Sequence, residues 1–199
     1  MIVPGGHSPS PWVVRWLSAI PFGGAVLDVA CGNGRHVALL RANGRRVVAV
    51  DRDTTAITAL AAAEAECGIE VVTTDLENSP WPWAGRTFAG VIATNYLWRP
   101  LLPTILRSVA VGGLLVYETF LRGQEQFGRP SNPAYLLLPG ELREVVRGEL
   151  EVLAFEEGPD GEPPLAMRQR ICARRPGVFV PEQGAMNCRP AERQTPERR

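Results

Sequence analysis

Apolar and polar positions follow two alternating patterns along most of the chain. Short apolar runs rich in β-branched residues predict strands, and these runs cover residues 25–30, 46–50, 70–74, 88–94 and 114–118. Apolar residues at helical spacing predict helices between and before them, over residues 10–17, 35–43, 53–67 and 100–110. Strands that alternate with helices are typical of an open, mostly parallel sheet covered by helices on both faces. The predicted fold class is therefore α/β, with a doubly wound sheet.

The last third of the chain follows a different order. A long loop over residues 122–139 precedes a predicted helix at 141–147 and two predicted strands at 151–156 and 169–173. The segment between these strands, G-P-D-G-E-P-P, leaves no room for a crossover helix, so they should pair antiparallel. From Pro176 onward the sequence is rich in proline and charge. We therefore expect one domain over residues 1–175 and a flexible tail over 176–199.

Charge and composition exclude several function classes. The 21 basic residues cancel the 21 acidic ones, so bulk binding to nucleic acid is not expected. All basic residues are arginine, which excludes Schiff-base chemistry and the lysine-dependent phosphate loop. Four cysteines without a CxxC pair and two histidines predict no metal centre. Neither a signal peptide nor a membrane span is evident, so we expect a cytoplasmic protein that does not bind membranes; its oligomeric state stays open.

The strongest motif is V-L-D-V-A-C-G-N-G-R, which ends at Arg35 and joins the first predicted strand to a helix. A dinucleotide fingerprint needs G-x-G-x-x-G to receive a pyrophosphate, but here Ala30 replaces the first glycine and Arg35 the third. An acidic residue ahead of the turn, Asp28, suits instead a cofactor that has a cationic amine and no phosphate. S-adenosylmethionine is such a cofactor.

Two more carboxylates follow predicted strands. Asp51 ends the second strand about 20 residues past the glycine turn, where a carboxylate can accept ribose hydroxyls in doubly wound folds. Asp75 ends the third strand and offers the same geometry to an adenine amino group. With Asp28, these residues predict one groove for a nucleoside.

These residues resemble the class I S-adenosylmethionine-dependent methyltransferases over roughly residues 11–174, and within them the tellurite-resistance methyltransferase branch. The branch resemblance rests on L-D-V-A-C-G-N-G-R and on P-G-E-L-R at residues 139–143, followed by F-E-E and R-Q-R-I-C-A. It implies that Asp28 and the turn backbone hold the methionine part, Asp51 the ribose, and Asp75 with Leu76 the adenine, with the residues after the fourth strand also facing the cofactor. The expected cofactor-binding set is Asp28, Ala30, Cys31, Gly32, Asn33, Gly34, Asp51, Arg52, Asp75, Leu76, Asn95 and Tyr96.

The acceptor side carries weaker signals. Arg99 is a candidate to steer an anionic acceptor, Glu118 a candidate base or substrate clamp, and His36 a candidate proton shuttle, although each also has a purely structural interpretation. The loop over residues 122–135 is predicted to act as a substrate lid. The stretch N-Y-L-W-R-P lacks the pattern used on exocyclic base amines. We therefore expect a methyltransferase for a small, soft or anionic acceptor, such as a thiol, a chalcogen oxyanion or a small metabolite. The alternatives are a non-catalytic cofactor-binding scaffold and a nicotinamide-dependent oxidoreductase.

Overall fold

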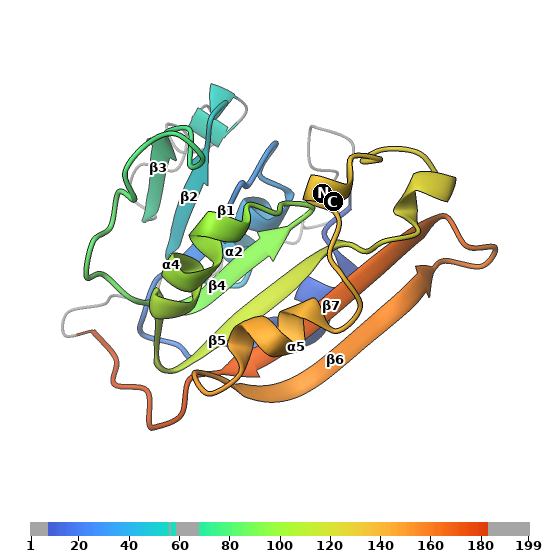
Figure 1. Ribbon diagram of the computed structural model, residues 1–199. Coiled ribbons are helices and arrows are strands. Elements are labelled where there is room, and N and C mark those ends of the chain that lie inside the picture. Colours follow the sequence, from blue (N-terminus) through green and yellow to red (C-terminus); the bar gives the residue numbers. More distant parts are fainter. Residues whose placement is uncertain (1–7, 56, 59–67, 183–199) are drawn as a thin grey trace, which may run out of the picture.

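The computed structural model describes residues 8–55, 57–58 and 68–182 and shows a seven-stranded sheet (Figure 1). The strand order is β3-β2-β1-β4-β5-β7-β6. The run β3-β2-β1-β4-β5 consists of parallel pairs, and β7 runs antiparallel to both of its neighbours, β5 and β6. The bounds are β1 (Val26–Val29), β2 (Val47–Asp51), β3 (Ile69–Thr73), β4 (Phe88–Thr94), β5 (Val109–Phe120), β6 (Glu151–Asp160) and β7 (Ala166–Arg174). The predicted α/β fold and the antiparallel end of the sheet are confirmed.

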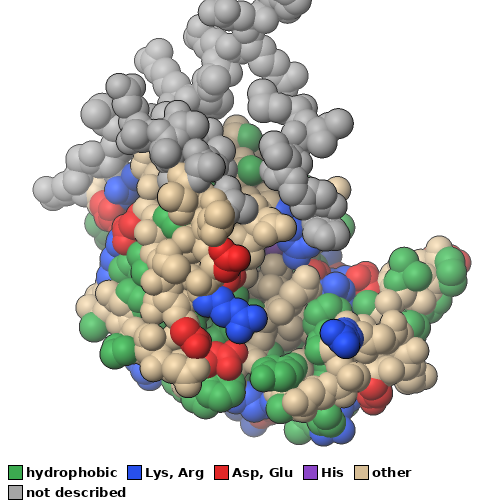
Figure 2. Space-filling view, turned by 90° about the horizontal axis from the view of Figure 1, so that it is seen from above, with side chains coloured by type: hydrophobic (Ala, Val, Ile, Leu, Met, Phe, Trp, Pro, Cys, Tyr) green, Lys and Arg blue, Asp and Glu red, His purple; other side chains and the backbone are tan. Residues whose placement is uncertain are grey.

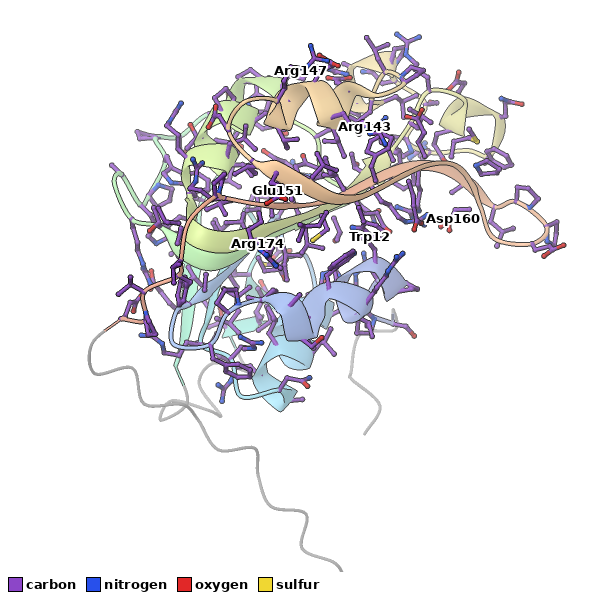
Figure 3. All side chains as sticks on the ribbon, turned by 90° about the horizontal axis from the view of Figure 1, so that it is seen from below. Trp12, Arg143, Arg147, Glu151, Asp160 and Arg174 are labelled. Carbon is purple, nitrogen blue, oxygen red and sulfur yellow. The ribbon has the colours of Figure 1, made fainter. Side chains whose placement is uncertain are left out.

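Helices cover both faces of the sheet. The described α-helices are α1 (Pro11–Trp16), α2 (Arg35–Ala42), α4 (Leu102–Arg107) and α5 (Glu141–Val146). Figure 3 shows α1 and α5 on opposite sides of the β6–β7 pair. Two buried clusters match these layers, because alternate side chains of each strand point to opposite faces. None of the described helices is long and apolar enough to cross a membrane, and most of the predicted helix 53–67 lies outside the described residues.

The boundary between α4 and β5 differs from the prediction. The helix expected over residues 100–110 ends at Arg107, and β5 begins at Val109 rather than at Leu114. Gly112, at φ +72°, lies inside the strand, where the register against β4 shifts. Glycine signals a helix stop in sequence, but here it permits an irregularity within a strand.

The chain continues to pack beyond the predicted domain end at residue 175. A Cβ at Gly112 would lie 2.3 Å from the backbone nitrogen of Phe179, and a Cβ at Gly24 would lie 2.7 Å from the Phe179 ring. Glu182 donates its backbone N–H to the Gly23 carbonyl at 2.9 Å and forms an ion pair with Arg46. Residues 176–182 are therefore docked on the body, contrary to the expectation of a free tail from 176. The remainder of the predicted tail lies outside the described residues.

Phe179→Ala should lower the melting temperature. The half-buried ring fills the space that two glycines leave open, so its loss should cost about 1–2 kcal/mol, less than for a fully buried phenylalanine. Thermal unfolding measures this as a fall of several degrees. The matched control is Val178→Ala, because Val178 is 84% exposed and should change little. Equal melting temperatures for the two variants would show that the docked segment contributes nothing.

Candidate functional site

The glycine turn lies at the carboxyl ends of β1, β2 and β4, and a carboxylate fixes it. Asp51 accepts the Gly32 backbone N–H at 2.8 Å on one oxygen and the Asp53 backbone N–H at 3.2 Å on the other. Gly32 adopts φ +53°, and a Cβ there would meet nothing within 4 Å. The turn is thus pinned to the end of β2 while its outer side stays open to a ligand.

Two residues without the freedom of glycine adopt the left-handed conformation in this region. Ala30 follows β1 with φ +52°, and Asn95 follows β4 with φ +56°. Left-handed backbone costs a non-glycine residue free energy and persists only where surrounding contacts impose it. The strain marks the ends of neighbouring strands, β1 and β4, which is where doubly wound sheets place their ligands.

Asp28 is a buried carboxylate without a hydrogen bond. Its side chain is 1% exposed, and among the described residues neither oxygen has a partner. Burial raises the pKa of Asp28 to about 7, although the charge of Arg35 opposes that shift. A buried carboxylate without a hydrogen bond is costly, so Asp28 is a candidate to bind a cationic group of a ligand.

The other strand-end groups lie around the same opening. Burial raises the pKa of Tyr96, and the carboxylates of Glu77, Asp75 and Asp51 add to the shift, which places its hydroxyl near them. That hydroxyl is buried and has no partner among the described residues. The Asp75 pKa is lowered by hydrogen bonds from the Asn78 side chain and the Glu77 backbone. The remaining predicted residues in this region are the buried Cys31, Gly34 and Leu76 and the exposed Asn33 and Arg52.

His36 links the start of α1 to the turn region. Its Nε2 accepts the Ser10 backbone N–H at 3.1 Å, and its Nδ1 lies 3.9 Å from Asp28. Burial lowers the pKa of His36 to about 3, with a further contribution from Arg35, so the ring is neutral at pH 7. Because Nε2 serves as an acceptor, the hydrogen of the neutral ring resides on Nδ1. The lone pair that a proton shuttle would use is therefore engaged, and His36 holds two elements together.

Glu118 belongs to a network of charges at the ends of β5, β6 and β7. Its Oε2 accepts from Arg170 Nε at 2.6 Å, and its Oε1 lies 3.6 Å from Arg168. Asp160 pairs with the same two arginines at 2.6 and 3.0 Å. Arg168 also donates to the Asn95 side chain at 2.7 Å. Both arginine partners of Glu118 come from β7, because β7 inserts beside β5 in the sheet.

Arg99 is engaged on the other side of the sheet. It makes a bidentate pair with Glu141 at 2.7 and 2.9 Å and donates to the backbone carbonyls of Ala134 and Leu136. These hydrogen bonds, chiefly those with Glu141, raise the Arg99 pKa. The structure therefore assigns Arg99 to holding the segment before α5 rather than to steering an acceptor.

A pocket of about 440 Å³ opens beside the glycine turn, between α1 and the ends of β5 to β7. Figure 3 shows Trp12 between α1 and the β6–β7 pair, with Asp160 near the same end of these strands. None of the residues of the predicted lid 122–135 lines this pocket. Its lining consists of Ser8, Pro9, Ser10, Pro11, Trp12, Arg15, Arg35, Glu118, Glu156, Asp160, Arg168 and Arg170.

Sequence reasoning missed most of these pocket residues. Arg35 was noted only as the end of the glycine motif, and Arg168 and Arg170 only as part of a family-like stretch. In a chain whose basic residues are all arginine, a single arginine carries little signal. Arg168 and Arg170 reach the pocket because β7 inserts antiparallel between β5 and β6, and no local sequence pattern predicts that insertion.

Comparison with known proteins identifies a family match over the segment that contains the glycine turn. Residues 26–112 match the family described as methyltransferase domain. A comparison with curated protein sequences gives no significant match.

Three solved structures illustrate the shared fold. TehB from Haemophilus influenzae is 20% identical, with a TM-score of 0.66, and the match covers 86% of this chain but only 64% of that one. An S-adenosylmethionine-dependent methyltransferase from Mesorhizobium loti is 17% identical (TM-score 0.62; 81% and 96% covered). The 1,6-didemethyltoxoflavin-N1-methyltransferase from Burkholderia thailandensis, solved with its substrate and S-adenosylhomocysteine, is 19% identical (TM-score 0.63; 84% and 77% covered). At these identities the likeness concerns the fold.

Proposed function

We propose that this chain is an S-adenosylmethionine-dependent methyltransferase and that it methylates a small acceptor that is soft or already ionised; the match of residues 26–112 to the methyltransferase domain family supports the activity. The observation that carries this proposal is that every carboxylate lining the pocket is paired with an arginine. Glu118 and Asp160 pair with Arg168 and Arg170, and Glu156 pairs with Arg15 at 2.7 Å. An acceptor that enters here must therefore be nucleophilic without help from a general base.

The residues around the turn fit the cofactor. Asp28 offers a buried, unpaired carboxylate for the ammonium group, and the open side of Gly32 leaves room for the methionine part. We propose that Asp51 binds the ribose, that Asp75 and Leu76 bind the adenine, and that the orphaned Tyr96 hydroxyl faces the same ligand. The Tyr96 hydroxyl is thus a second buried polar group, besides the Asp28 carboxylate, that has no hydrogen-bond partner among the described residues.

S-adenosylmethionine, when bound beside the turn, would supply an electrophilic methyl group on a sulfonium sulfur, and the acceptor would supply the electron pair for the new bond. The chain contributes orientation and exclusion of water. His36 and Ser10 hold the start of α1 against the turn, so the pocket wall over residues 8–12 keeps its position beside the cofactor region. Glu118 forms ion pairs with Arg168 and Arg170 and so holds both guanidinium groups in place.

The distribution of charge on one described face is consistent with a small acceptor rather than a polyanion. On the face seen in Figure 2, basic and acidic side chains are interspersed and form no patch of one sign. The scaffold alternative keeps the cofactor groups but predicts no turnover. The oxidoreductase alternative requires binding of a dinucleotide, for which the turn lacks two glycines.

An acceptor panel tests the proposal directly. We expect release of S-adenosylhomocysteine, measured by mass spectrometry, with small thiols, selenite or tellurite, and rates at least about 100-fold lower with neutral alcohols and protonated amines, which need a base. Calorimetry should show binding of S-adenosylhomocysteine and none of NAD. Faster methylation of amines than of thiols and oxyanions would refute the proposed acceptor class, and cofactor binding without turnover on any acceptor would favour the scaffold.

A further inference from the structure

The pocket contains one more arginine than carboxylates. Its four arginines are Arg15, Arg35, Arg168 and Arg170, and its three carboxylates are Glu118, Glu156 and Asp160. In the ion pairs described above, all three carboxylates pair with Arg15, Arg168 or Arg170, and none pairs with Arg35. Across the described part of the chain, no carboxylate lies within ion-pair distance of Arg35. The excess positive charge of the pocket therefore resides on this residue.

Arg35 also connects the pocket to the cofactor region. It is the first residue of α2, directly after the glycine turn, and its side chain is half-buried. One guanidinium nitrogen donates to the Thr94 hydroxyl at 3.3 Å, at the end of β4. Its charge lowers the pKa of Asp28 against the larger effect of burial, which places the two groups close together. Of the pocket-lining residues, Arg35 alone comes from the motif segment 26–35.

We infer that Arg35 binds an anionic group of the methyl acceptor, a carboxylate or an oxyanion, and thereby selects anionic over neutral acceptors. This inference rests on the proposed function. A guanidinium with free donors pairs well with such groups, and the other pocket arginines are occupied by chain carboxylates. Arg35 is thus a specificity residue of the acceptor site, and its partner is a small molecule because the pocket measures about 440 Å³.

The test compares two thiols that share a mercaptoethyl group, 3-mercaptopropionate with an anionic carboxylate end and 3-mercapto-1-propanol with a neutral hydroxymethyl end. The wild-type protein should favour the anion in kcat/KM by roughly 10-fold, Arg35→Gln should bring the ratio close to one, and Arg35→Lys should retain most of it. A ratio cancels any effect of the variant on the cofactor, which both acceptors share. The matched control is Arg107→Gln, because Arg107 also donates to a threonine hydroxyl (3.1 Å) but lies outside the pocket.

A binding measurement separates this inference from the proposed function. Calorimetry of 3-mercaptopropionate with the S-adenosylhomocysteine complex should show a Kd that Arg35→Gln weakens roughly 10-fold or more and that Arg107→Gln leaves unchanged. If binding depends on Arg35 but no acceptor turns over, the inference stands and the proposed function fails. If the variant loses both acceptors equally and also loses S-adenosylhomocysteine affinity, Arg35 serves the cofactor and the inference is overturned. Turnover or binding with no dependence on Arg35 overturns it as well.

Discussion

Asp28→Asn should stabilise the ligand-free protein at pH 8 and at the same time weaken its binding of S-adenosylhomocysteine. The wild-type carboxylate is buried without a hydrogen bond, so ionisation in the folded state is unfavourable. The amide removes this cost but keeps some desolvation of its own, and we expect a gain of about 1–3 kcal/mol. The lost charge-assisted contact with the ammonium group should weaken affinity roughly 30-fold or more. Denaturant unfolding and calorimetry measure the two effects.

The pH dependence provides a second readout of the same residue. The Asp28 pKa is about 7 in the folded protein, against an ordinary value of 3.8. Between these values the folded state binds more protons than the unfolded state, so this group makes the protein less stable as pH rises from about 4 to 7. Affinity for the cofactor should change in the opposite direction, because the ionised carboxylate binds the ammonium. The advantage of Asp28→Asn in stability should vanish below about pH 4.

Asp53→Asn is the control for Asp28, because Asp53 is an exposed carboxylate close to the same turn. It should leave the unfolding transition close to that of the wild type between pH 4 and 8, because asparagine can still accept the hydrogen bonds that Thr55 donates to Asp53. If Asp28→Asn instead destabilises the ligand-free protein at pH 8, Asp28 has a partner within the chain, and its assignment to the cofactor loses its physical basis.

Glu118→Gln should destabilise the protein by about 3 kcal/mol, because it breaks a buried network rather than a surface pair. Glu118 is 4% exposed, and Arg168 and Arg170 are only 15% and 17% exposed at their side chains. Asp160 alone would then face both guanidinium groups. Glu156→Gln is the matched control, because the Arg15–Glu156 pair is about half-exposed and should contribute less than about 1 kcal/mol.

Turnover by folded Glu118→Gln distinguishes a structural role from a catalytic one. With a thiolate acceptor at a temperature where the variant is folded, we expect kcat to stay within about 10-fold of wild type. A general base would instead contribute about 10²–10⁴-fold, and its loss would be relieved as pH approaches the pKa of the acceptor. A loss of kcat of this size, together with that pH profile, would show that Glu118 acts as a general base.

Local patterns were sufficient to predict where the groups proposed to bind the cofactor lie, because all of them belong to local segments. The strand, the glycine turn and Asp28 form one continuous segment, and Asp51 and Asp75 follow directly from the ends of their strands. Parallel strands bring their carboxyl ends to one edge, so positions at strand ends are sufficient to predict that these groups meet. The sequence also excluded lysine chemistry and a dinucleotide turn, since both require residue types that the chain lacks at those positions.

The acceptor half was decided by tertiary structure. Glu118 pairs with Arg168 and Arg170 across about 50 residues of chain only because β7 inserts between β5 and β6. Arg99 finds Glu141 and two loop carbonyls through the packing of the segment before α5, and Phe179 finds Gly24 and Gly112 by shape. Which of the four pocket arginines keeps an unpaired charge depends on how the other three are neutralised, and that is a property of distances between remote side chains. Sequence patterns thus determined the sheet and the glycine turn through local periodicity and strand ends, whereas the charge of the pocket was determined only by long-range pairing.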